Sequence, residues 1–246
     1  MTKKQNTIPF VIGHRGACGH APENTLPSFE KAMEYGVRWV EVDVKLSSDG
    51  VAFLMHDDSL ERTTDGEGLV AETPWSKLAK LDAGRWFDAE YTGTRLLRFE
   101  DAIGHLDAMG VGLNIEIKGC AGREEETAEI VCNLVEDGWP SGLPAPIFSS
   151  FEVSSLMRTR ELLPDAAISM LFNDLPDDWR DICGRIGASG IHIWNESVDP
   201  GTASVLRDAG YALRAFTVNQ RTRAGELKDL GFSGIFCDFP ERMTGL

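Results

Sequence analysis

The amino-acid sequence predicts an α/β fold, a (β/α)8 TIM barrel, in which eight parallel strands alternate with helices. Short apolar runs alternate with amphipathic stretches along nearly all of the 246 residues. This alternation is typical of a parallel sheet whose strands are joined by helices, and about 250 residues is the usual size of the barrel. A doubly wound sheet is the weaker alternative, because neither common glycine-rich phosphate-binding loop follows the first apolar run.

Eight apolar runs are the expected barrel strands. They span residues 10–14, 39–45, 112–118, 146–150, 167–172, 190–194, 211–218 and 234–238. Amphipathic segments between them predict the helices. Asn24 is the expected N-cap of the first helix, whose apolar face includes Leu26 and Phe29. Another helix is expected to begin at the acidic residues 124–126, because negative charge stabilises a helix N-terminus.

The interval from Leu46 to about Arg98 departs from the alternation of strands and helices, because it is much longer than a barrel loop. Residues 47–50 (SSDG) form a turn too short for a parallel crossover, so the run 51–56 must return antiparallel to the second strand. The second helix is then expected to begin near Phe99 and to end by Gly110. We therefore predict one barrel domain over residues 1–246, with residues 47–98 as an insertion over the active-site mouth.

Charge and composition exclude several classes of protein. Lysine and arginine total 24 and aspartate and glutamate total 39, which gives a net charge of −15. Nucleic acid would meet net repulsion, and an anionic substrate needs a local cationic pocket. No run approaches the roughly 18 apolar residues of a membrane helix, and no signal-peptide core is present. We expect a cytoplasmic protein without nucleic-acid partners or stable membrane association, and the oligomeric state stays open.

The cysteines do not predict a disulfide framework or a thiolate zinc site. The five are scattered and form no C-x-x-C pair: Cys18, Cys120, Cys132, Cys183 and Cys237. Most are expected to be small buried apolar residues. Cys18 lies close in the sequence to His14, but nothing around it predicts a reactive thiolate, so a packing role is favoured.

Three carboxylates on neighbouring strands are expected to meet inside the barrel. Side chains two positions apart share a strand face, so the valines of WVEVDVK face the helices while Glu41 and Asp43 point inward. GLNIEIK repeats this arrangement around Glu116. Several buried anions need protons, fixed cations or a metal, and an all-oxygen site suits Mg2+ or Ca2+. The competing interpretation is that these acids pair with arginine and lysine at the barrel mouth.

Two histidines add acid/base chemistry at the same rim. The first predicted strand ends in His14 and Arg15, and His56 ends the returning strand. Two histidines near a metal and an arginine suit phosphoryl chemistry, since one removes a proton from the attacking oxygen and the other protonates the leaving oxygen. Each histidine alone would more often be structural. His192 alternates with Ile191 and Ile193, which is compatible with a side chain that lines the barrel, but we favour a hydrogen-bonded core histidine.

An ordered set of motifs now points to a known family. In chain order they are His14-Arg15, Pro22-Glu23-Asn24-Thr25, Glu41-x-Asp43, Asp49-Gly50, His56-Asp57, Arg62-Thr63-Thr64-x-Gly66 and Glu116-Ile117-Lys118. This set resembles the glycerophosphodiester phosphodiesterase family of the bacterial cytosolic type. Residues 148–151, 216–219 and 234–238 also resemble its later strand ends, so the resemblance covers nearly the whole chain. It implies a (β/α)8 barrel with a small insertion after the second strand.

The resemblance also implies a set of site residues. They are Glu41, Asp43 and Glu116 for one divalent cation, Mg2+ or Ca2+, His14 and His56 for catalysis, and Arg15 and Lys118 for phosphate contacts. One departure is Phe216, where family members commonly carry a tryptophan on the substrate rim.

The activity implied is metal-dependent hydrolysis of glycerophosphodiesters, such as glycerophosphocholine and glycerophosphoethanolamine, to sn-glycerol 3-phosphate and an alcohol. The resemblance favours attack by the substrate's own 2-hydroxyl, through a 1,2-cyclic phosphate, over direct attack by water. One alternative is a related, phospholipase-like barrel phosphodiesterase that acts on another diester. Another is a non-catalytic barrel that binds a phosphorylated ligand, although binding alone does not need a proton donor and acceptor.

Overall fold

Eight parallel strands close into a barrel because the first of them pairs with both the second and the last. The computed structural model describes residues 8–120 and 122–246. The barrel strands are β1 (Val11–Gly13), β2 (Trp39–Leu46), β4 (Gly112–Ile117), β5 (Ile147–Ser150), β6 (Ala167–Phe172), β7 (Gly190–Trp194), β8 (Ala212–Phe216) and β9 (Gly234–Cys237). All eight predicted strands are confirmed, and with them the (β/α)8 fold.

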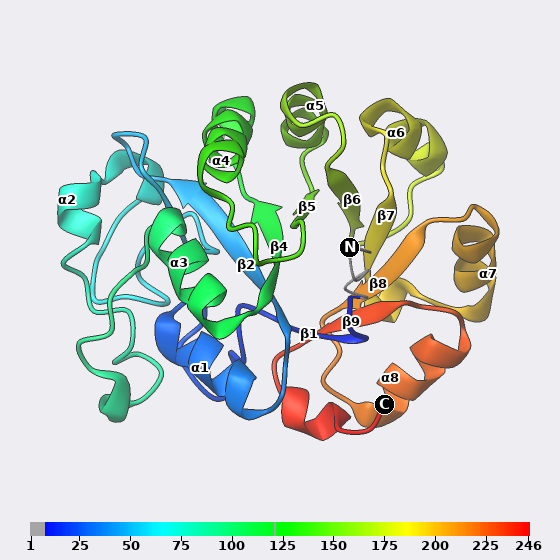
Figure 1. Cartoon of the computed structure of the whole chain (residues 1–246), viewed down its shortest axis with the longest axis horizontal. Helices are drawn as coiled ribbons and strands as arrows, with labels where there is room; N and C mark the ends of the chain where they lie inside the picture. Colours follow the sequence, from blue (N-terminus) through cyan, green and yellow to red (C-terminus); the bar gives the residue numbers. More distant parts are fainter. Residues whose placement is uncertain (1–7, 121) are drawn as a thin grey trace.

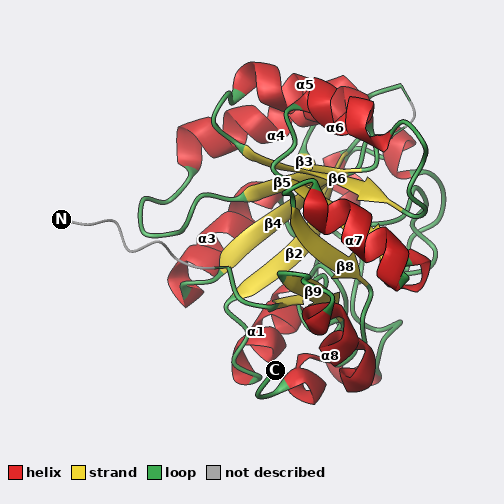
Figure 2. Cartoon of the chain, turned by 90° about the vertical axis from the view of Figure 1, so that its right-hand side faces the viewer, coloured by secondary structure: helices red, strands yellow, loops and turns green. Residues whose placement is uncertain are grey.

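Helices surround the barrel on its outside (Figures 1 and 2). They are α1 (Leu26–Glu34), α3 (Phe99–Met109), α4 (Glu124–Gly138), α5 (Val153–Leu162), α6 (Trp179–Ile186), α7 (Pro200–Asp208) and α8 (Arg221–Asp229). The last barrel strand, β9, is followed by a four-residue 3-10 helix, η4 (Pro240–Met243), and not by the expected α-helix. As predicted, α3 begins at Phe99 and ends before Gly110, which adopts a left-handed conformation with φ 65°.

The main hydrophobic core lies between the strands and the helices. Val40, Val42 and Val44 of β2 are buried in one cluster together with Phe29 of α1 and Phe99 of α3. Because side chains alternate along a strand, packing the valines outward turns the intervening acidic side chains of β2 into the barrel. The hydrophobic pattern of this strand therefore positions its polar face.

The chain between β2 and α3 contains four short elements, which are drawn in cyan and blue-green in Figure 1. They are β3 (Ala52–Leu54), η1 (Val70–Glu72), α2 (Trp75–Leu78) and η2 (Ala89–Tyr91). β3 pairs antiparallel with β2, as the four-residue turn requires. A separate hydrophobic cluster that includes Phe53, Leu60 and Leu78 stabilises this segment. In the described part of the chain, no helix is long and apolar enough to cross a membrane.

One local prediction is wrong. The N-cap of α1 is Thr25, and the side chain of Asn24 does not cap the helix. Asn24 instead adopts φ 57°, and its amide group bonds both the carboxylate and the main-chain N–H of Asp43. A tertiary contact with a buried acid therefore prevails over the local capping preference.

The packing of α3 gives the first prediction. Leu106 is fully buried in the main core, so Leu106→Ala should lower the free energy of unfolding by about 2–5 kcal/mol. Val205 of α7 is 41% exposed, and Val205→Ala should change the free energy of unfolding by less than about 0.5 kcal/mol. Urea denaturation measures both values. Equal destabilisation by the two variants would contradict the packing of α3 against the barrel.

Candidate active site

Three carboxylates meet at the carboxyl end of β2 and β4. The register of these strands places Asp43 opposite Glu116, with Glu41 two residues earlier on β2. Ligand oxygens of the three residues all lie within 4.8 Å of one another. Glu41 Oε1 and Asp43 Oδ1 are buried and have no hydrogen-bond partner among the described residues. An all-oxygen set with unpartnered oxygens fits a hard divalent cation.

The charges of this carboxylate trio (Glu41, Asp43 and Glu116) interact strongly. Burial, and then the charges of the other two acids, raises the pKa of Glu41 well above its usual value. Burial and Asp43 likewise raise the pKa of Glu116. Burial opposes ionisation of Asp43 as well, but the charges of Arg15 and Lys118 outweigh it and lower the pKa of Asp43 to about 2. A divalent cation would stabilise all three charged forms.

Arg15 and Lys118 lie against the trio. The main-chain N–H of Arg15 donates to Glu41 Oε2 at 3.0 Å, and its Nε lies 3.1 Å from Asp43 Oδ2. Lys118 Nζ donates to Glu116 Oε1 at 3.0 Å and lies 3.8 Å from Asp43 Oδ1. The competing sequence interpretation, acids paired with fixed cations, therefore describes part of the site. Among the residues that the structure describes, Glu41 Oε1 and Asp43 Oδ1 remain without hydrogen bonds.

The turn after β1 directs Arg15 toward these acids. Arg15 has φ 51° and the following Gly16 has φ 90°. A Cβ on Gly16 would lie 2.7 Å from the main-chain carbonyl carbon of Ser28, so no larger residue fits there without movement. Ser28 also donates its hydroxyl to the Arg15 carbonyl at 2.6 Å, which fixes the turn.

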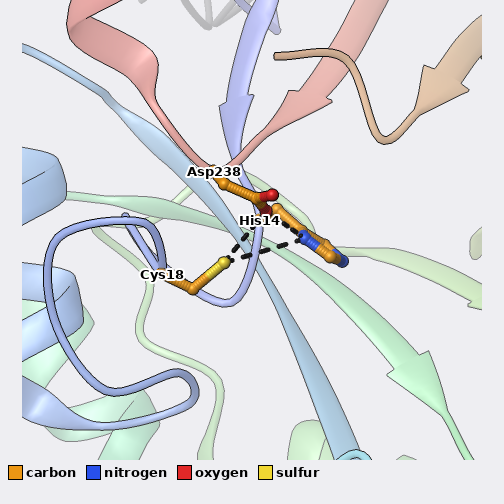
Figure 3. Close-up of side chains that lie close together, drawn as sticks. All are labelled: His14, Cys18 and Asp238. Atoms are coloured by element: carbon orange, nitrogen blue, oxygen red, sulfur yellow. Dashed lines mark hydrogen bonds and ion pairs between the residues drawn. The ribbon is translucent and has the colours of Figure 1, made fainter. Parts of the chain in front are cut away.

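His14 is oriented by an aspartate at the end of β9 (Figure 3). Its Nδ1 lies 2.6 Å from Asp238 Oδ1, and its Nε2 lies 4.0 Å from Glu41 Oε2. Asn219 holds Asp238 in place by donating to Oδ2 at 2.7 Å and accepting from its main-chain N–H at 2.9 Å. Neither Asp238 nor Asn219 was predicted from the sequence to act at the site. The imidazole therefore presents Nε2 to the interior of the site, with Nδ1 engaged by the carboxylate.

His56 is oriented in the same way by its neighbour. Its Nδ1 lies 2.6 Å from Asp57 Oδ1. Arg62 donates from Nε to Asp57 at 2.5 Å and from both Nη atoms to Glu23 at 2.8 Å. Glu23 also accepts from Arg15 Nη1 at 2.8 Å. A chain of charged hydrogen bonds thus joins His56 to Arg15, and it explains chemically why the Pro-Glu-Asn-Thr and Arg-Thr-Thr motifs accompany the site.

Both histidines face one cavity of about 310 Å³. Of the predicted site residues, those that line it are His14, His56, Arg15, Glu41 and Glu116. Phe151 and Phe216 form an aromatic wall, with ring centroids 5.8 Å apart in an edge-to-face arrangement. A neighbouring cavity of about 510 Å³ shares His56, Glu116 and Phe151, and Lys118 lines that one. The site therefore combines charged groups with an aromatic surface.

One expectation was wrong at this site, and a second holds only in part. His192 is fully buried, but neither ring nitrogen has a hydrogen-bond partner among the described residues, and the ring lines the cavity against Phe236. Burial, and then the charge of Arg214, lowers its pKa well below the usual value. Cys18 is not simply packed, since its thiol donates to Asp238 Oδ1 at 2.9 Å. Burial, and then the charge of Asp238, raises the pKa of this thiol.

Comparisons with known proteins find relatives of this chain in both sequence and structure. The sequence model of the Glycerophosphoryl diester phosphodiesterase family matches residues 14–242. A putative glycerophosphodiester phosphodiesterase of Bacillus subtilis (strain 168), YhdW, is 32% identical over 239 residues, which cover 94% of this chain and 95% of that protein. The structure of an Oleispira antarctica phosphodiesterase in complex with the product sn-glycerol-3-phosphate is 39% identical with a TM-score of 0.92, covering 96% and 95% of the two chains.

Removing one charge from the trio gives the second prediction. Glu41→Gln should melt at or above the wild-type temperature without divalent cations, because it relieves repulsion with Asp43 and Glu116. Mg2+ or Ca2+ should raise the melting temperature of the wild type, and the variant should lose most of this rise. Scanning calorimetry after dialysis against EDTA measures both effects. A rise of equal size in both proteins would indicate that the cation binds elsewhere.

Proposed function

Because the chain belongs to the glycerophosphoryl diester phosphodiesterase family, we propose that it hydrolyses glycerophosphodiesters to sn-glycerol 3-phosphate and a free alcohol. Glycerophosphocholine and glycerophosphoethanolamine are the substrates of choice for a first test. The observation that carries the proposal is the single cavity that His14 and His56 share with Arg15 and with two members of the carboxylate trio, Glu41 and Glu116. The sn-glycerol-3-phosphate bound in the Oleispira antarctica relative supports the same product for this chain.

Glu41, Asp43 and Glu116 would hold one divalent cation, Mg2+ or Ca2+, as their oxygen-only donor set suggests. When bound, such a cation neutralises charge on the phosphate and lowers the pKa of a coordinated hydroxyl. Arg15 binds phosphate oxygens through its guanidinium, which the Glu23 carboxylate keeps in position. Lys118, at the border of the two cavities, adds a second positive charge.

The two histidines transfer protons. Asp238 and Asp57 accept hydrogen bonds from the Nδ1 atoms, so each Nε2 is the atom that exchanges a proton with the substrate. One histidine takes the proton of the glycerol 2-hydroxyl as that oxygen attacks phosphorus. The other donates a proton to the departing alcohol oxygen. Their roles then reverse when water opens the 1,2-cyclic phosphate, so each returns to its starting protonation state.

The activity and its metal requirement can be tested together. The purified protein should release sn-glycerol 3-phosphate from glycerophosphocholine in a coupled assay. Chelation should abolish this release, and added Mg2+ or Ca2+ should restore it, because the trio is all oxygen. Full activity after exhaustive EDTA dialysis, with no metal found by elemental analysis, would exclude the metal-dependent mechanism.

The acid/base assignment predicts large effects on kcat. His14→Ala and His56→Ala should each lower kcat by roughly 10²–10⁴-fold, the usual contribution of a positioned acid or base. Melting temperature and cation binding should stay near the wild-type values. The matched control is His105→Ala on the outer helix α3, which should retain full turnover. Near-normal turnover of either site variant would assign that histidine a structural role.

A modified substrate separates the two routes of attack. When ethylene glycol replaces glycerol in the diester, the substrate lacks the 2-hydroxyl, and the tethered nucleophile with its proximity advantage is gone. The cyclic route predicts almost no cleavage of this analogue under conditions in which the parent diester is hydrolysed rapidly. Turnover comparable to that of the parent would establish direct attack by water.

A further inference from the structure

A second group of potential metal ligands lies on the other side of the His14 ring. His14 Nδ1, Cys18 Sγ and Asp238 Oδ1 converge at the end of β1 and β9 (Figure 3). Asp238 Oδ1 lies 2.6 Å from His14 Nδ1 and 2.9 Å from Cys18 Sγ, and the sulfur lies 3.9 Å from Nδ1. We call these three residues the sulfur triad.

Main-chain hydrogen bonds hold the segments of the sulfur triad together. His14 N–H donates to the carbonyl of Cys237 at 3.0 Å, which ties the end of β1 to β9. Gly19 N–H donates to the carbonyl of Asp238 at 3.0 Å, which ties the loop that carries Cys18 to the same strand end. The donor atoms are therefore brought together by the backbone of the barrel rim, and not by their side-chain contacts alone.

The geometry of the sulfur triad is close to that of a zinc site. Zn2+ bonds of about 2.0–2.3 Å to nitrogen, oxygen and sulfur place neighbouring tetrahedral ligands about 3.3–3.6 Å apart. The observed separations of 2.6, 2.9 and 3.9 Å each differ from this by less than about 1 Å. The two short separations are hydrogen bonds, which an ion would replace. Small side-chain movements would therefore admit a metal.

The two metal-binding groups differ in chemistry. The carboxylate trio offers only oxygen and suits hard cations, whereas the sulfur triad offers one sulfur, one nitrogen and one oxygen. A thiolate ligand strongly favours Zn2+ over Mg2+ and Ca2+. His14 links the two groups, since its Nδ1 belongs to the sulfur triad and its Nε2 lies 4.0 Å from Glu41 Oε2.

We propose that His14, Cys18 and Asp238 form an inhibitory Zn2+ site, with a water molecule as the fourth ligand. On binding, the Cys18 thiol loses its proton to solvent. The His14 Nδ1 gives up its proton, Nε2 takes one up from solvent, and bonds from sulfur, Nδ1 and the Asp238 oxygen to zinc form. The ion then replaces the aspartate as the partner of Nδ1. Nε2 of the zinc-bound neutral imidazole already carries a proton, so it cannot accept one from the substrate, and the enzyme loses an acid/base group. This consequence rests on the proposed catalytic role of His14.

The activity test compares Cys18→Ser with a matched control. With Mg2+ saturating and each protein normalised to its own zinc-free rate, Zn2+ should inhibit the wild type. Cys18→Ser keeps a hydroxyl donor for Asp238 but has no thiolate. Half-inhibition of this variant should need at least about 100-fold more Zn2+, because even the loss of a residue that only hydrogen-bonds to a metal ligand lowers metal affinity by about 10–100-fold. Cys132→Ala, in the buried face of α4, should respond as the wild type does.

A spectroscopic test examines the site without relying on catalysis. Added Co2+ should give a thiolate-to-cobalt charge-transfer absorption in the wild type and in Cys132→Ala, and none in Cys18→Ser. If the protein lacks diesterase activity but shows this absorption, the proposed function fails and the metal site stands. Two results would overturn the site: no thiolate absorption in the wild type, or equal zinc inhibition of Cys18→Ser that excess Mg2+ relieves. The second would assign the inhibitory ion to the carboxylate trio.

Discussion

Two buried carboxylates, Glu41 and Asp43, and the partly buried Glu116 repel one another at the carboxyl rim of the barrel, and the surrounding groups are arranged around that repulsion. Burial raises the cost of each charge, and the pKa values of Glu41 and Glu116 rise accordingly. Arg15 and Lys118 offset part of this cost through direct ion pairs. Two buried carboxylate oxygens still lack partners among the described residues. The core packing of β2 holds the acids close together although their charges are only partly compensated, and the site therefore suits a divalent cation.

His14 connects this charge cluster to the rest of the barrel rim. One ring nitrogen is held by Asp238 at the end of the last strand, and the other faces the cavity. His56 reaches the same cavity from the segment after β3, and the Asp57–Arg62–Glu23 hydrogen bonds tie that segment back to Arg15. His14 is thus held by a residue from the far end of the chain, and His56 by residues from the first quarter of it.

The parts of the structure that follow from local periodicity could be predicted from the sequence. Eight alternating strand and helix patterns predicted the barrel. Alternation along β2 and β4 predicted the convergence of the carboxylates, because a two-residue period fixes which face of a strand is buried. The partners that orient the histidines could not be found this way. Asp238 is 224 residues from His14, and Glu23 is 39 residues from Arg62. Asn24 was misassigned as a cap because its preferred partner, Asp43, becomes available only in the folded barrel.

Binding of a metal by the carboxylate trio beside the two histidines can be observed in a crystal structure with Mn2+ and sn-glycerol 3-phosphate, with anomalous scattering recorded at the manganese edge. We expect one strong anomalous peak bonded to Glu41, Asp43 and Glu116. We also expect the phosphate between the ion and Arg15, within hydrogen-bonding reach of His14 and His56. A peak at other residues, or a phosphate bound away from both histidines, would contradict this arrangement.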